Sequence, residues 1–101
     1  VIINLINNSA DAIESLPEKW VELTVDEDEK YVFFRLKDSG NGIPDDIQKK
    51  MMTPFFTTKV IGKGTGLGLS ISKGIIEEHK GELTYNGESY NTEFIIKLPK
   101  V

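Results

Sequence analysis

A run of alternate glycines in this chain has the residue types and spacing to bind phosphate. Gly64, Gly66 and Gly68 lead directly into an apolar stretch with helical periodicity. Because glycine has no Cβ, the backbone can approach an anion closely, and the N–H groups and positive dipole end of the helix point at it. A P-loop is excluded because no Lys-Ser or Lys-Thr pair follows, and the dinucleotide fingerprint fails in every register. A flexible glycine hinge is the alternative interpretation.

Three asparagines near the start of the chain form a second unusual group. Asn4, Asn7 and Asn8 are poor helix formers within an otherwise helical pattern, each costing roughly 0.5 kcal/mol or more relative to alanine. Asn4, Asn8 and Asp11 share one helical face, away from the apolar stripe. Amide oxygens there could ligate Mg²⁺ that also holds phosphate oxygens. A solvated helix face is the alternative.

Asp38 is the third candidate, because it ends a row of alternating apolar residues. Counting in twos, Phe34, Leu36 and Asp38 share one face of a strand, so a carboxylate points towards the core. A buried charge needs a partner, and the exocyclic amino group of adenine would supply a donor. The glycines at 40 and 42 would let the backbone turn around a flat ring. An ordinary Asp-rich turn is the alternative.

The elements that must position these residues follow from periodicity and turn residues. We predict helices and two β-hairpins that together form an α+β two-layer sandwich, in which helices cover one face of a mostly antiparallel sheet. The expected helices span residues 1 to about 15, about 45 to 52 and about 66 to 79, with Leu67, Ile71 and Ile75 along the buried face of the last. Gly81 is expected to end that helix. The expected hairpins span residues 21–37 and 83–98, and a long loop spans 53–65.

Composition limits the class of protein. One hundred and one residues suit a single small domain over residues 1–101, and a net charge of −4 argues against a nucleic-acid surface. No apolar run approaches the roughly 20 residues that span a bilayer, so no direct membrane contact is expected. The absence of cysteine fits a reducing compartment. Val1 starts inside a helical pattern without a cap, which indicates a fragment truncated at its N-terminus. The uncovered sheet edge that this implies would favour a homodimer.

Together these segments resemble the ATP-binding catalytic domain of sensor histidine kinases, in the superfamily shared with DNA gyrase, mismatch-repair ATPases and heat-shock chaperones. Four motifs appear in the family's order. They are the asparagine box at 4–12 (NLINNSADA), the first glycine box at 38–44 (DSGNGIP), the phenylalanine box at 54–59 (PFFTTK) and the second glycine box at 62–70 (GKGTGLGLS). The resemblance implies a Bergerat-type fold that binds ATP and Mg²⁺ and covers nearly the whole chain.

The resemblance also implies roles for single residues. Asn8 would coordinate Mg²⁺. Asp38 would accept a hydrogen bond from the adenine amino group, and Gly40, Gly42 and Ile43 would shape the adenine pocket. The second glycine box would line the phosphate channel, and the phenylalanine box would anchor a lid. The remaining nucleotide-binding residues implied in these two segments are Phe55, Phe56, Thr58, Lys59, Gly64, Thr65, Gly66, Leu67, Gly68 and Leu69.

Asn4 separates the branches of this superfamily. ATP-hydrolysing relatives carry a glutamate there as general base, and an amide cannot take a proton from water. With Asn4 and Asn8 as its catalytic residues, the chain would hold ATP for attack by a histidine on a separate dimerisation domain, with a response regulator downstream. The domain is expected to be cytoplasmic, and a membrane anchor on the parent protein is left open. His79 is expected to be a helix-end residue. Ser9 and Asp11 depart from the family's usual alanine and basic residue, so a phosphate contact at position 11 is not implied.

Two other functions remain open at the level of sequence. One is a serine kinase of the anti-sigma type, whose catalytic domain is similar. The other is a nucleotide-binding interaction module without catalysis.

Overall fold

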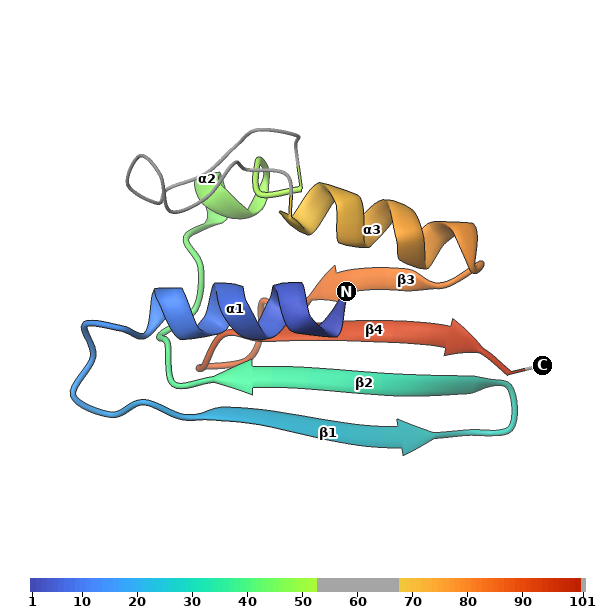
Figure 1. The fold of residues 1–101 in the computed structure, drawn as a ribbon, viewed down its shortest axis with the longest axis horizontal. Coiled ribbons are helices and arrows are strands. Elements are labelled where there is room, and N and C mark those ends of the chain that lie inside the picture. The colour runs from blue at the N-terminus through green and yellow to red at the C-terminus, as the bar shows by residue number, and fades with distance from the viewer. Residues whose placement is uncertain (53–67, 101) are drawn as a thin grey trace.

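The computed structural model describes residues 1–52 and 68–100, which form four strands and three helices (Figure 1). The strands are β1 (Val21–Glu27), β2 (Tyr31–Asp38), β3 (Glu82–Tyr85) and β4 (Glu93–Pro99). The helices are α1 (Ile2–Ala12), α2 (Asp45–Gln48) and α3 (Gly68–Glu78). The expected α+β fold is confirmed. Two of the helices are shorter than predicted: α1 ends five residues before Pro17, and α2 ends at Gln48 instead of Met52.

The sheet is antiparallel throughout, in the order β1-β2-β4-β3. Both hairpins therefore form as their alternating patterns predict, and β2 pairs with β4 to join them. In this register Leu36 lies opposite Phe94 and Phe34 opposite Ile96, so all four share one face. That face packs against α1 and α3, which together cover one side of the sheet.

The core lies between this face and the helices. Its buried apolar members are Leu5, Leu36, Met51, Ile76, Leu83, Phe94 and Ile96. Burying one such side chain stabilises the fold by roughly 1.5–3 kcal/mol. The edge strand β1 is less well covered by the helices. Its Val25, on the helix side of the sheet, is 59% exposed. Within the described residues, no helix has the length and apolar character needed to cross a membrane.

The buried face of α3 was predicted wrongly. Ile71 and Ile75 are exposed, whereas Ser72 and Ile76 are buried, with Leu69 packed on the core. The apolar spacing of Leu67, Ile71 and Ile75 was misleading because a small serine takes a core position that hydrophobicity alone would not assign. Ser72 is completely buried, and its hydroxyl has no hydrogen-bond partner among the described residues.

The end of α3 also differs from the prediction. Lys80, not Gly81, adopts the left-handed conformation, with φ of 64°. The amide of Gly81 donates to the carbonyl of Ile76 at 3.0 Å and that of Lys80 to Glu77 at 2.9 Å, which is the Schellman arrangement. Gly81 serves another purpose, because a Cβ there would overlap the carbonyl oxygen of Lys97.

Candidate nucleotide-binding site

Asp38 ends β2 as a buried carboxylate on the core-facing side, as its position in the strand predicts. It is 1% exposed and shares its face with Leu36. One carboxylate oxygen accepts the amide of Gly40 at 2.8 Å. This bond fixes the carboxylate against the loop that follows it.

The loop after Asp38 is packed too closely to admit side chains at its glycines. A Cβ on Gly40 would lie 2.8 Å from both Asp38 Oδ1 and Thr92 Oγ1. Gly42 has a φ of 91°, a conformation that residues with a Cβ rarely adopt. The glycines at 40 and 42 are therefore required by the shape of this loop.

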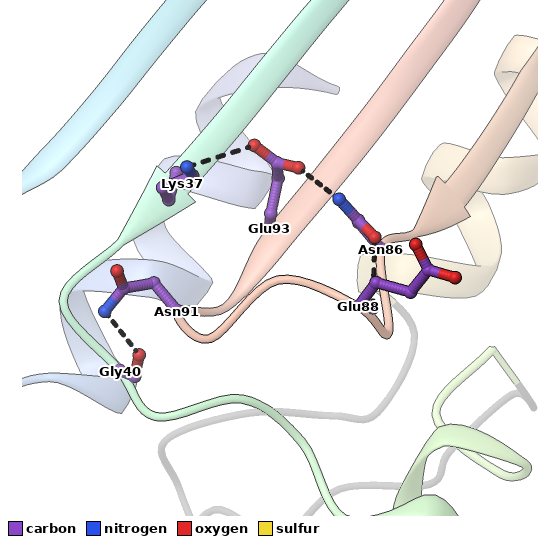
Figure 2. Close-up of polar contacts among 6 residues, drawn as sticks. All are labelled: Lys37, Gly40, Asn86, Glu88, Asn91 and Glu93. Carbon is purple, nitrogen blue, oxygen red and sulfur yellow. Dashed lines mark hydrogen bonds and ion pairs between the residues drawn. The ribbon is translucent and has the colours of Figure 1, made fainter.

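Side chains from the end of β3 and from the connection between β3 and β4 hold the loop in place. Thr92 Oγ1 accepts the amide of Gly42 at 3.1 Å, and Asn91 Nδ2 donates to the carbonyl of Gly40 at 3.2 Å. The hydroxyl of Tyr85 accepts the amide of Ile43 at 2.8 Å. Figure 2 shows the Asn91–Gly40 contact between these two segments. Sequence reasoning missed all three residues, because their partners lie 42 to 51 positions away.

The start of β4 carries a buried carboxylate that anchors this connection. Glu93 is 6% exposed and accepts from Asn86 Nδ2 at 2.8 Å, while Lys37 Nζ lies 3.7 Å from its other oxygen (Figure 2). Asn86 Oδ1 in turn accepts the amide of Glu88 at 3.1 Å. A charge at this depth is tolerated because it has both a cation and an amide donor. The turn is thereby fastened to β2.

Ser39 fastens the other side of the loop. Its hydroxyl donates to the carbonyl of Glu18 at 2.9 Å and accepts the amide of Trp20 at 3.2 Å. The backbone of Ser39 also donates to the carbonyl of Trp20 at 3.0 Å. The first glycine box is thus held from both flanks.

The asparagines lie on α1 as predicted, on the side away from its buried residues. Leu5 and Ser9 are buried, whereas Asn8 is half-buried and Asn4 is exposed, as is Asp11. Among the described residues, no group of three or more His, Cys, Asp or Glu side chains could hold a metal ion. A metal at Asn8 would therefore depend on ligand phosphates and water. That donor set suits Mg²⁺, which commonly takes one or two protein oxygens.

Three elements that carry the predicted motifs have the relevant ends directed towards the same side of the molecule (Figure 1). The C-terminal ends of α1 and β2 and the N-terminal end of α3 all lie towards the end of the sheet where the first glycine box follows β2 (Figure 1). Gly68 begins α3, and Leu69 packs on the core. The other predicted residues of the lid and second glycine box lie outside the described residues. These are Phe55, Phe56, Thr58, Lys59, Gly64, Thr65, Gly66 and Leu67.

A cavity of about 330 Å³ flanks the first glycine box. Its lining includes Gly42, Ile43, Asp45, Gln48 and Tyr85, but neither Asn8 nor Asp38. The cavity therefore lies beside the loop, on the flank formed by α2 and the β3–β4 connection.

With this geometry established, the chain can be compared with known proteins. The sequence model of the histidine kinase-, DNA gyrase B- and HSP90-like ATPases matches residues 1–101. The chain belongs to this family. Sporulation kinase A of Bacillus subtilis is 42% identical over 102 residues, covering 99% of the chain and 16% of that protein. Sensor kinase CckA of Brucella abortus is 49% identical over 72 residues, covering 70% of the chain and 8% of that protein.

Solved structures agree with the sequence relatives. The catalytic domain of histidine kinase ThkA superposes with a TM-score of 0.81 at 35% identity, covering 98% of this chain and 64% of that one. The mycobacterial sensor histidine kinase MprB gives a TM-score of 0.80 at 27% identity, covering 97% and 66%. The chain is thus an ATP-binding catalytic domain of the two-component sensor histidine kinase type. It spans less than a fifth of the length of each curated relative compared above.

Proposed function

We propose that the chain binds Mg-ATP at the end of the sheet beside Asp38 and presents the γ-phosphoryl group to a histidine on a separate dimerisation domain. The observation that carries the proposal is the fixed carboxylate of Asp38, which is buried and bonded to Gly40 at a point where the neighbouring atoms leave no room for a Cβ. A buried acceptor at this point suits the adenine amino group. A full-length ShkA structure, 26% identical and with a TM-score of 0.74, is a complex with AMPPNP, which supports nucleotide binding by a protein that contains this fold.

Different residues of the chain would then bind the base, the phosphates and the metal ion. Asp38, Gly40, Gly42 and Ile43 would hold the base, and the N-terminal end of α3 would present its N–H groups and positive dipole to the phosphates. Asn8 would supply an amide oxygen to Mg²⁺, and the bound ion would offset phosphate charge. The residues of the lid and second glycine box named above complete the enclosure of the nucleotide.

The amide side chain of Asn4 favours phosphoryl transfer over hydrolysis of ATP. It presents an exposed amide on α1, and an amide cannot act as general base towards water. The nucleophile would be a histidine ring nitrogen of the dimerisation domain. It forms a bond to the γ-phosphorus as the bond from that phosphorus to the bridging oxygen of ADP breaks, and positioning and electrostatics carry such a step. A response regulator would take the phosphoryl group from that histidine.

Phosphotransfer with a matched acceptor tests this proposal. The chain is incubated with γ-labelled ATP, Mg²⁺ and the dimerisation domain of its parent protein. We expect label on the acceptor that is lost in acid, as a phosphohistidine requires. Acid-stable label would indicate a serine kinase, and absence of label with bound nucleotide would indicate an interaction module.

Omitting the metal tests the role of Asn8. For Asn8→Ala, ATP affinity should become nearly independent of added Mg²⁺, whereas the wild-type affinity should rise with it. Mg²⁺ strengthening binding equally in both proteins would remove Asn8 as a ligand. Asn7→Ala, an exposed change on the same helix, serves as the control.

A further inference from the structure

Tyr85 joins the end of β3 to the first glycine box in a way that its sequence position does not reveal. Its ring packs edge-on against Phe94, with centroids 5.3 Å apart, and its hydroxyl accepts the amide of Ile43 at 2.8 Å. The ring contact fixes where the hydroxyl lies. The hydroxyl in turn fixes the direction of one peptide N–H in a loop 42 residues away.

That peptide unit lies next to an unusual backbone conformation. It follows Gly42, whose φ of 91° is a backbone conformation that residues with a Cβ rarely adopt. Because the peptide bond is trans and planar, an Ile43 N–H directed at Tyr85 sends the carbonyl of Gly42 to the opposite side. The hydroxyl of Tyr85 therefore determines that the carbonyl of Gly42 is the group directed away from β3.

The two ends of this loop are bonded to the β3–β4 connection and not to each other. The carbonyl of Gly40 is taken by the amide of Thr92 at 3.2 Å and by Asn91 Nδ2, while the amide of Ile43 is taken by Tyr85. A four-residue turn closed on itself would have used that carbonyl and that amide together. The loop is instead held open from outside.

We propose that Tyr85 is a positioning residue for recognition of the nucleotide base. It acts through the Gly42–Ile43 peptide and touches no part of the ligand itself. The inference rests on the proposed function, in which this loop and Asp38 surround the base. Its consequence is that the Tyr85 hydroxyl determines how well the site distinguishes adenine from other bases, as well as how tightly it binds ATP.

The test compares Tyr85→Phe with Tyr90→Phe. The first removes only the hydroxyl, and the second removes a hydroxyl from a tyrosine on the same connection that is 78% exposed. Affinities for ATP and GTP are measured by calorimetry, and hydrogen exchange of the Ile43 amide is followed without nucleotide. For Tyr85→Phe we expect the dissociation constant for ATP to rise about threefold to tenfold, the effect of one neutral hydrogen bond.

We further expect the preference for ATP over GTP to narrow and the Ile43 amide to exchange faster, with Tyr90→Phe matching the wild type. Unchanged ATP affinity, an equal loss for ATP and GTP, or unchanged exchange at Ile43 would each overturn the inference. Failure of the proposed function is distinguishable, because the wild type itself would then not bind ATP. The exchange measurement would still decide whether Tyr85 holds the loop.

Discussion

Gly40 is the residue whose replacement should most directly test the packing around Asp38. The space of a Cβ at this position is already occupied by Asp38 Oδ1 and Thr92 Oγ1, each 2.8 Å away. For Gly40→Ala we expect a loss of about 1–3 kcal/mol in the free energy of unfolding, as overpacking of a rigid site costs. Nucleotide affinity should fall as well, because the carboxylate must move.

Gly74→Ala is the matched control for this change. A Cβ at Gly74, within α3, would meet nothing within 4 Å. Alanine should therefore stabilise the helix by roughly 0.5–1 kcal/mol, since glycine loses more backbone freedom on folding. Both values come from denaturant unfolding at one temperature. Similar effects of the two substitutions would contradict the close packing described at Gly40.

At the residue scale, the sequence predicted what strand alternation can predict. The inward position of Asp38 follows from counting in twos from Phe34, and the structure confirms it. Thr92 and Tyr85 could not be assigned in this way. Their contacts with the glycine box depend on how two strands far apart in the chain end side by side, and no local pattern encodes that.

The end of α3 offers a test at the scale of an element. Lys80 occupies the left-handed position of the Schellman motif, which costs a residue with a Cβ roughly 1 kcal/mol. Lys80→Gly should therefore raise the free energy of unfolding by up to about 1 kcal/mol, measured by denaturant titration. A decrease would mean that the Lys80 side chain contributes more than its backbone strain costs.

The β1–β2 hairpin contains the group whose pKa shift is clearest. Asp28 Oδ1 accepts the amides of Lys30 at 2.8 Å and Tyr31 at 2.7 Å, and these bonds hold the pKa of the carboxyl below its usual value. Since the folded state favours the ionised form, the stabilisation is present above the unfolded pKa. It is lost as the pH falls through the folded pKa.

Asp28→Asn isolates this effect, because the neutral amide oxygen still accepts the two N–H groups. We expect the wild type to be the more stable protein at neutral pH and the difference to vanish in strong acid. Unfolding of both proteins followed across this pH range provides the measurement. A difference that stays constant with pH would show that the ionised carboxylate is not what the turn favours.

Among the elements, hairpins were predicted better than helix faces. Period-two alternation leaves one choice of face once a strand is assigned, and both hairpins form with the expected partners. In α3, isoleucines at 71, 75 and 76 allow more than one apolar stripe, and the structure selects the one containing Ser72. Packing against the sheet and α1 decided this, which the helical pattern by itself could not do.

At the scale of the whole molecule, the fold brings separate motifs to one end of the sheet. The helix of the asparagine box, the carboxylate that ends β2 and the start of α3 are distant in sequence, yet the order β1-β2-β4-β3 with helices on one face directs the relevant ends towards the same side of the molecule. Family membership supports the same arrangement. Within the described part of the chain, the buried carboxylate of Asp38 is the polar group on which the proposed site depends.

Replacing Asp38 with asparagine tests the central claim most directly, with ADP and ATP affinity measured by calorimetry. Asparagine keeps the shape and can still accept the Gly40 amide, but it offers an NH₂ donor where the carboxylate offers a second acceptor. The account predicts a dissociation constant about tenfold to a hundredfold higher, the effect of losing a charged hydrogen bond, with an unchanged unfolding transition. An affinity equal to that of the wild type would contradict the claim that Asp38 accepts a hydrogen bond from the adenine amino group.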